Sequence, residues 1–161
     1  MKIYIEYLAE SDRQTPAYKA VESTLRANAA IPCQSSDNLI TTLRNINTND
    51  ESVLLTILTH GHPDGINFGT RASLLPWRKL CQIVNDCVTN HPLILNLAGV
   101  CNSNLIGEFR PLLGQNIQKI WATTDWVNSI SKSLLLSNSI DFNDFILNLD
   151  EPERIKYQEI V

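Results

Sequence analysis

The sequence lacks an excess of basic residues and lacks any long hydrophobic run. Its 13 Lys and Arg are outnumbered by 17 Asp and Glu, giving a net charge of −4, whereas a nucleic-acid-binding protein usually carries a basic face. Apolar runs such as 134–136 are far too short to span a bilayer. The alternating first residues include Glu6, which is not typical of a secretory signal. We therefore expect no nucleic-acid and no membrane partner, and exclude collagen, coiled-coil, membrane-spanning and secreted disulfide-rich classes.

Cysteine is also scarce. The chain has four cysteines, and none of them forms a CxxC pair; they are Cys33, Cys81, Cys87 and Cys101. Without a signal peptide, this pattern favours a reducing, cytoplasmic compartment. In that setting each cysteine is either a small buried hydrophobic residue or a reactive thiol. Cys81 and Cys87 lie on the apolar side of an expected helix, which predicts that both are buried.

What the chain does have is the composition of an ordinary globular protein, with 43% hydrophobic and 19% charged residues. Its 161 residues suit one domain, and we see no repeat, linker or low-complexity tract. The pattern predicts strands at 2–8, 31–33, 52–59, 66–68, 93–100 and 118–123. It predicts helices at 15–30, 36–46, 76–88, 104–113, 129–136, 141–149 and 152–158. This alternation indicates a single α/β domain over residues 1–161, with three layers and a largely parallel central sheet flanked by helices.

Two apolar strands end in residues that can carry chemistry. The first strand finishes at His60-Gly61, and the second finishes at Cys101. If these strands are parallel neighbours, their carboxyl ends meet at the edge of the sheet where ligands bind. Cys101 can then act as a nucleophile and His60 as its acid/base partner. The backbone N–H groups of Gly61 and Cys101 are candidates for an oxyanion hole, and the helix expected after Cys101 favours a thiolate.

At these residues the sequence resembles the caspase-like cysteine peptidases, a clan that includes caspases, metacaspases and separase. The resemblance is carried by a hydrophobic strand ending in His60-Gly61 and a second strand ending in Cys101. It is nearest to the bacterial CHAT domains, because Ser103 follows the cysteine and Asp64-Gly65 follows the histidine. The resemblance implies a caspase-like fold and a cysteine endopeptidase, a hydrolase that cleaves peptide bonds through a thioester acyl-enzyme. It further implies a protein or peptide substrate, a regulatory protein partner and no cofactor.

Substrate preference is harder to derive from the sequence. Asp125 and Trp126 follow the strand at 118–123 and are candidates for a specificity pocket, with an acidic residue selecting Lys or Arg or an indole forming an apolar wall. Asp64 has the same two interpretations. A solvated carboxylate in a turn explains either aspartate equally well, so no specificity is assigned from the sequence.

Alternative interpretations of the same residues stay open. His60 and Cys101 are structural in one of them, in a caspase-like module that binds partners without catalysis. In another, His60 and His62 form half of a metal site that Cys101 or His91 completes, although we expect no metal. A third is a Rossmann-like ligand-binding domain, which is disfavoured because residues 9–13 after the first strand contain no glycine-rich phosphate loop.

Overall fold

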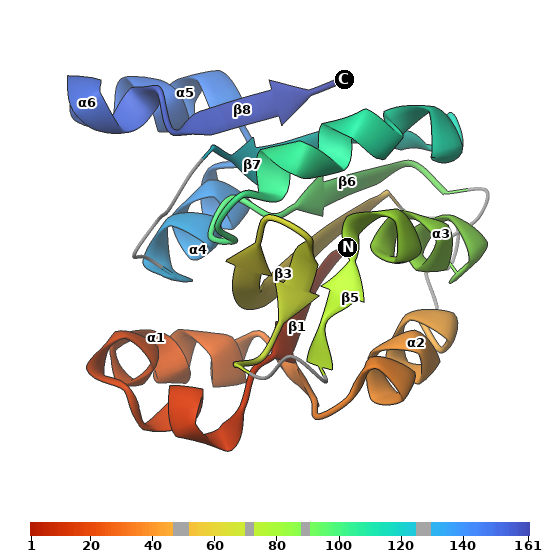
Figure 1. The fold of residues 1–161 in the computed structure, drawn as a ribbon. Helices are drawn as coiled ribbons and strands as arrows, with labels where there is room; N and C mark the ends of the chain where they lie inside the picture. The colour runs from red at the N-terminus through yellow and green to blue at the C-terminus, as the bar shows by residue number, and fades with distance from the viewer. Residues whose placement is uncertain (47–51, 70–72, 88–90, 125–129) are drawn as a thin grey trace.

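The described strands form one connected sheet whose main part is parallel (Figure 1). The computed structural model describes residues 1–46, 52–69, 73–87, 91–124 and 130–161. Across the sheet, the strands are β2 (Ile31–Cys33), β1 (Lys2–Tyr7), β3 (Val53–His62), β6 (Leu93–Asn96), β7 (Ile117–Thr123) and β8 (Tyr157–Ile160). Neighbours from β2 to β7 pair in parallel, whereas β8 pairs antiparallel with β7. The expected α/β class with a largely parallel central sheet is confirmed.

Strand β3 continues beyond this parallel sheet into a small antiparallel extension. Its last residues pair with β4 (Gly65–Asn67), which in turn pairs with β5 (Leu75–Pro76). The hydroxyl group of Thr59 donates to the Asn67 carbonyl at 2.8 Å and ties the two strands together. The segment around His60 is therefore regular strand in the structure, where the sequence suggested a loop.

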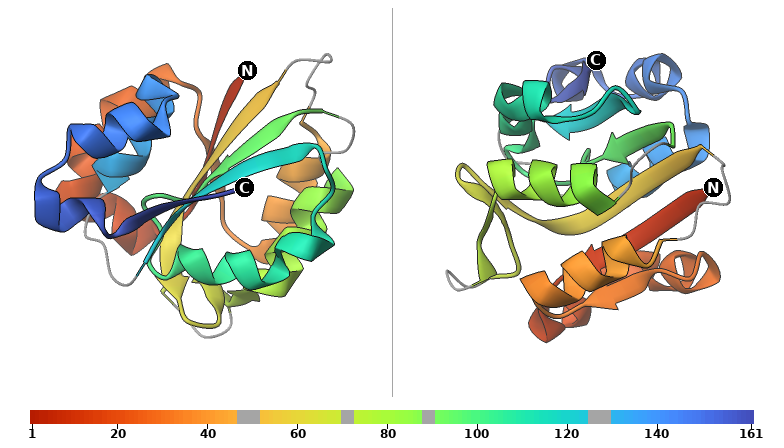
Figure 2. Two further views of the ribbon diagram at one scale, coloured as in Figure 1. Left: turned by 90° about the horizontal axis from the view of Figure 1, so that it is seen from above. Right: turned by 90° about the vertical axis from the view of Figure 1, so that its right-hand side faces the viewer.

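Helices cover both faces of the sheet (Figure 2). The two 3₁₀ segments that matter here are η1 (Glu10–Gln14) and η3 (Ser103–Leu112). The α-helices are α1 (Pro16–Ala27), α2 (Ser36–Arg44), α3 (Trp77–Cys87), α4 (Ile130–Ser139), α5 (Phe142–Leu147) and α6 (Glu151–Arg154). Helix α1 begins as its sequence predicts, with Pro16 in the first turn and the Tyr18 N–H donating to Thr15 Oγ1.

The period of two along the strands determines which helices each face contacts. Odd-numbered positions of β1 and β3 pack under α2, α3 and η3, and they include Ile5, Leu55 and Ile57. Even-numbered positions pack under α1, α4 and α5, and they include Tyr4, Leu54 and Leu58. Because β1 and β3 are apolar on both faces, they lie in the middle of the sheet with helices on either side.

Several elements differ from their sequence-based prediction. The strand β5 was not predicted, and the helix predicted at 104–113 is the 3₁₀ segment η3. Residues 157–160 form β8, where a helix over 152–158 was predicted; the helix α6 is only one turn long. The alternation of the buried Tyr157 and the exposed Gln158 fits an edge strand, with Tyr157 packed against α5. Strand β6 ends at Asn96, and residues 97–102 form turns. The short η1 segment was not predicted.

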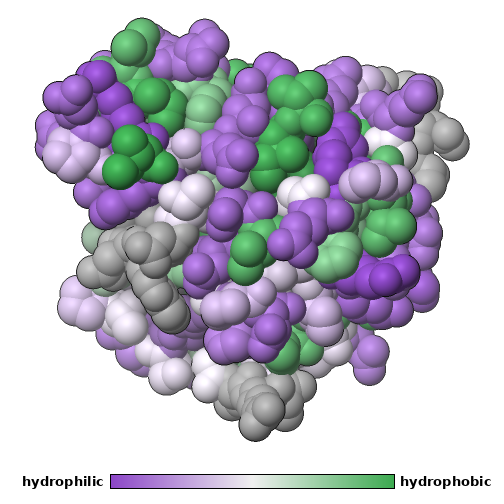
Figure 3. Space-filling view, turned by 45° about the horizontal axis from the view of Figure 1, so that its top comes forward, coloured by the Kyte–Doolittle hydropathy of each residue, from purple (hydrophilic) through white to green (hydrophobic). Residues whose placement is uncertain are grey.

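None of the described helices combines the length and the apolar character that crossing a bilayer requires. The face shown in Figure 3 carries hydrophobic residues in small groups that are separated by hydrophilic ones. Scattered exposed residues such as Leu147 and Ile155 are ordinary for a folded protein surface, because polar residues alone do not cover a globule.

Candidate active site

The segments that carry His60 and Cys101 leave the sheet at the same edge. Strands β3 and β6 are parallel neighbours, with Thr56 opposite Asn96 in the register. His60 lies beyond Thr56 and Cys101 lies beyond Asn96, in the same chain direction. The expectation that these two strands are adjacent and parallel is confirmed. Cys101 does not end the strand itself, however, because β6 stops at Asn96 and a turn separates them.

Gly61 brings the two segments into direct contact. A Cβ atom built on Gly61 would lie 1.7 Å from the carbonyl oxygen of Cys101 and 2.7 Å from its backbone nitrogen. Heavy atoms that are not bonded cannot approach so closely, so any side chain at position 61 would push the Cys101 main chain away. The glycine after His60 is thus required by the close packing of β3 against the cysteine segment.

The buried side chain of Asn96 connects the turn before Cys101 to the rest of the fold. Its Oδ1 accepts a hydrogen bond from the Ala98 N–H at 3.1 Å. Its Nδ2 donates to Thr56 Oγ1 at 3.1 Å and to the Ser133 carbonyl of α4 at 3.0 Å. One amide therefore links β3, β6, α4 and the turn, and each of these bonds is made out of contact with water.

Ser103 and Thr123 hold the other side of the cysteine segment. The Ser103 hydroxyl donates to the Leu97 carbonyl at 2.9 Å and accepts from the Thr123 N–H at 2.8 Å. The Thr123 hydroxyl donates to the Ala98 carbonyl. Asn102 adopts the left-handed conformation, with φ of 58°, and η3 begins directly after it. Ser103 is therefore buried, and it fixes the cysteine segment against the end of β7 and against the residue that follows β6.

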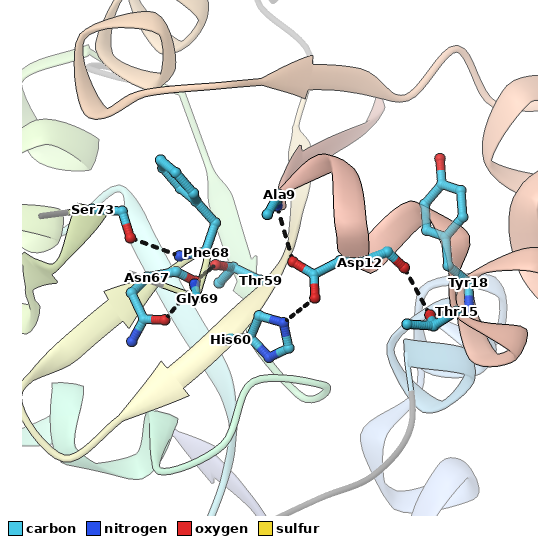
Figure 4. A network of polar contacts seen from close by, with 10 residues as sticks. All are labelled: Ala9, Asp12, Thr15, Tyr18, Thr59, His60, Asn67, Phe68, Gly69 and Ser73. Carbon is cyan, nitrogen blue, oxygen red and sulfur yellow. Dashed lines mark hydrogen bonds and ion pairs between the residues drawn. The ribbon is translucent and has the colours of Figure 1, made fainter. Parts of the chain in front are cut away.

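His60 contacts a carboxylate that the sequence reading did not select. Its ring nitrogen Nε2 lies 2.7 Å from Asp12 Oδ1, and Figure 4 shows the two side chains pointing toward one another. Asp12 belongs to η1, which follows β1, and β1 is the other parallel neighbour of β3. The second carboxylate oxygen, Oδ2, accepts the Ala9 N–H at 2.9 Å and so fixes the orientation of the carboxylate.

This contact assigns the two nitrogens of the imidazole. An ionised carboxylate accepts hydrogen bonds and donates none, so the proton of the His60–Asp12 bond resides on Nε2. The other nitrogen, Nδ1, is then the atom able to take up a proton. The His60 side chain is 53% exposed and that of Asp12 is 21% exposed, so a substrate can reach the imidazole while the carboxylate is sheltered.

Sequence reasoning missed Asp12 although a signal for it was present. A carboxylate directly after a strand lies at the carboxyl edge of a parallel sheet, as His60 and Cys101 do. What the sequence did not reveal was the strand order, in which β1 lies beside β3. The acidic pair Glu10 and Asp12 in the first turn of η1 would also repel a phosphate group, which further disfavours the Rossmann-like interpretation.

The other described cysteines lie in the core. Cys33 and Cys81 are fully buried, so the expectation for Cys81 is confirmed. Burial raises the pKa of the Cys81 thiol to about 11 and also raises the pKa of Cys33. Cys101 is half-buried. The side chain of Cys87 lies outside the described part of the chain.

The remaining candidates are distributed over the molecule. Asp64 and His62 are exposed in the β3–β4 turn, where the Asp64 N–H donates to His62 Nδ1. His91 precedes β6 at the opposite end of that strand from Cys101. Within the residues that the structure describes, no three His, Cys, Asp or Glu side chains are grouped to hold a metal ion. Asp125 and Trp126 lie outside the described residues.

No protein family model matches the chain, and no curated protein matches it either.

Proposed function

We propose that this protein is a cysteine endopeptidase in which Cys101 is the nucleophile and His60 is the acid/base. The observation that carries the proposal is the convergence of three strand ends at one edge of the sheet. Asp12 holds His60 Nε2, and the Gly61 backbone is packed directly on that of Cys101. An orienting carboxylate, a base and a nucleophile are the groups that acyl transfer uses, and all three candidates come from this edge of the sheet.

The proposed reaction has two steps. In the first, His60 Nδ1 takes the thiol proton, Cys101 Sγ attacks the carbonyl carbon of the peptide, and the imidazolium protonates the leaving amine as the C–N bond breaks. In the second, His60 takes a proton from water as the water oxygen attacks the thioester carbonyl carbon. The C–S bond then breaks, the imidazolium protonates the departing thiolate, and the peptide leaves with a new carboxyl group. The backbone N–H groups of Gly61 and Cys101 are our candidates for stabilising the oxyanion in both steps.

Asp12 is a positioning residue in this scheme. It acts by keeping the proton on Nε2 and by stabilising the imidazolium that forms during each step. The hydrogen bond from the Ala9 N–H prevents the carboxylate from rotating away. A regulatory partner protein is part of the proposal through the resemblance to caspase-like peptidases, and a cytoplasmic setting is part of it through the cysteine pattern.

A mixed peptide library, digested and analysed by mass spectrometry, tests the proposal. We expect cleavage by the wild-type protein and loss of cleavage in Cys101→Ala and in His60→Ala. His91→Ala is the control, because His91 precedes β6 at the opposite end of that strand from Cys101. Absence of any Cys101-dependent cleavage, with and without added partner proteins, would favour the non-catalytic caspase-like module.

A further inference from the structure

A cleft of about 220 Å³ lies between the β3–β4 turn, the start of α3 and the 3₁₀ segment η3. Its walls are mostly apolar and come from Pro63, Pro76, Leu105 and Phe109. The volume is smaller than the roughly 300–1,000 Å³ typical of small-molecule sites. A cleft of this size fits one side chain of a larger ligand better than a whole cofactor.

The cleft adjoins the proposed catalytic pair through both of its walls. On one side, the chain runs from Gly61, which contacts Cys101, through His62 to Pro63. On the other side, the Leu105 N–H donates to the Asn102 carbonyl at 3.1 Å, so η3 starts at the cysteine segment. Both walls of the cleft are thus continuous in the chain with the residues that contact or follow Cys101.

The turn that forms one wall is fixed before any ligand binds. The indole Nε1–H of Trp77 donates to the Pro63 carbonyl at 3.1 Å, and the Trp77 backbone N–H donates to the Asp64 carbonyl at 3.3 Å. Trp77 itself is buried in the core with only 3% of its surface exposed. The walls are therefore held by the packing of α3, which reduces the ordering cost of binding.

The charges at the rim are predominantly acidic. Asp64 contributes one carboxylate, with 73% of its side chain exposed, and the exposed Glu108 contributes a second. The exposed Arg78 contributes one guanidinium group. Apolar walls below carboxylates suit the side chain of Lys or Arg, whose aliphatic stem packs on apolar surface while its charged head stays at the rim.

We propose that this cleft is a specificity subsite that binds a Lys or Arg side chain of the peptide substrate, at a residue flanking the bond that is cleaved. The inference rests on the proposed peptidase function, since it places a substrate chain across Cys101. The stem of the basic residue contacts Leu105 and Phe109, and its head group lies between Asp64 and Glu108.

The test compares charge variants in two assays with one random peptide pool. In the first assay, cleavage products are sequenced by mass spectrometry, and we expect Lys and Arg to be enriched at one flanking position. Glu108→Gln and Asp64→Asn should each lower that enrichment about two- to fivefold, as expected for exposed ion pairs. Glu108→Lys should replace it by an enrichment of Asp and Glu at the same position. Glu151→Lys, on the exposed first turn of α6, is the matched control and should change nothing.

The second assay needs no catalysis. The Cys101→Ala variant is immobilised, the same peptide pool is passed over it, and retained peptides are compared with those retained by Cys101→Ala combined with Glu108→Lys. Suppose that Cys101→Ala retains basic peptides, that the double variant retains acidic peptides, and that the wild type cleaves nothing. This result would support the cleft as a binding site for basic side chains and refute the peptidase function. If the wild type cleaves peptides but none of the cleft variants changes the residue preferred beside the cleaved bond, the proposed subsite is refuted and the peptidase function is supported. Retention that ignores charge, together with absent cleavage, would refute both.

Discussion

Individual thiols of this protein differ in how far reagents can reach them, and this difference gives a test that needs no substrate. Cys33 and Cys81 are fully buried, and burial raises both of their pKa values, that of Cys81 to about 11. Near neutral pH both remain protonated, and the thiolate is the reactive form. Cys101 is half-buried at the edge of the sheet.

We therefore predict that Cys101 is alkylated well before Cys33 and Cys81 in the folded protein. Limited treatment with iodoacetamide followed by peptide mapping measures the order of labelling. Repeating the treatment in denaturant should make the three sites react at similar rates, because the pKa shifts arise from burial. If Cys33 or Cys81 were labelled faster than Cys101 in the native state, the assignment of the nucleophile would be wrong.

The substitution Asp12→Asn tests which nitrogen of the His60 imidazole carries the proton. The amide has a single acceptor oxygen, whereas Asp12 accepts from both the Ala9 N–H and the His60 Nε2–H. An amide nitrogen turned toward His60 favours the tautomer with its proton on Nδ1, which then cannot take the proton of the thiol. We expect the peptidase rate to fall by about 10²-fold or more, as carboxylate-to-amide changes do in serine peptidases.

The control for this variant is Asp141→Asn. Asp141 also accepts a backbone hydrogen bond, from the Asp144 N–H at the start of α5, but it has no part in the proposed site. Asparagine caps a helix about as well as aspartate, so Asp141→Asn should leave the stability nearly unchanged. An equal loss of activity in the two variants would show that Asp12 acts only by stabilising the fold.

At the scale of elements, the contact between β3 and the cysteine segment is the feature most sensitive to mutation. In Gly61→Ala the new Cβ would lie 1.7 Å from the Cys101 carbonyl oxygen, and the Gly61 backbone cannot move away without breaking its pairing with Ile66 of β4. We expect the free energy of unfolding to fall by roughly 3 kcal/mol, the upper part of the usual range for overpacking. Urea-induced unfolding measures this change, and peptide cleavage should be lost along with it.

Gly107→Ala is the matched control for that substitution. The nearest heavy atom to its Cβ would be Ile160 Cδ1 at 3.3 Å, the end of a side chain that can turn away. We expect a change of less than about 1 kcal/mol, since removing a glycine from a helical segment also restricts the unfolded chain. A Gly61→Ala variant as stable and as active as Gly107→Ala would contradict the close approach at Cys101.

Local chemistry explains which elements were predictable from sequence. Helix α1 was predictable, because Thr15 and Pro16 are strong signals for the start of a helix and act locally. Strands β3 and β6 were, because both are short apolar runs. Strand β8 was not, because it exists through its pairing with β7, and pairing partners are not encoded in the period of one segment. The His60–Asp12 contact depends on strand order in the same way.

For the whole molecule, three tyrosines connect stability to pH. Tyr7, Tyr18 and Tyr157 lie in three separate hydrophobic clusters, on the two faces and toward the β8 edge of the sheet. Burial raises the pKa of each from 10.0 to about 12, and for Tyr18 the hydrogen bond to the buried Glu6 adds to the effect. Each of the three clusters thus holds a phenol whose neutral form the folded protein favours.

The consequence is an alkaline limit to stability. Above pH 10 the unfolded chain loses its phenol protons, whereas the folded protein keeps them until about pH 12. The stabilisation from these groups is fully present below pH 10 and is lost as the pH rises to 12. Each tyrosine contributes a slope of about 1.4 kcal/mol per pH unit, so the three together give about 4.

Urea-induced unfolding measured at intervals from pH 9 to pH 11.5 determines that slope. Tyr157→Phe is the variant that changes least else. The ring of Tyr157 packs edge-on against Phe145, with 5.2 Å between the ring centroids, and a phenylalanine can keep this contact while lacking the hydroxyl group that titrates. We expect this variant to lose about 1.4 kcal/mol per pH unit of slope above pH 10 while remaining close to the wild type in stability below pH 9. A slope that is unchanged in Tyr157→Phe would mean that this tyrosine is already accessible to water in the folded state, and that β8 does not close the core at that edge.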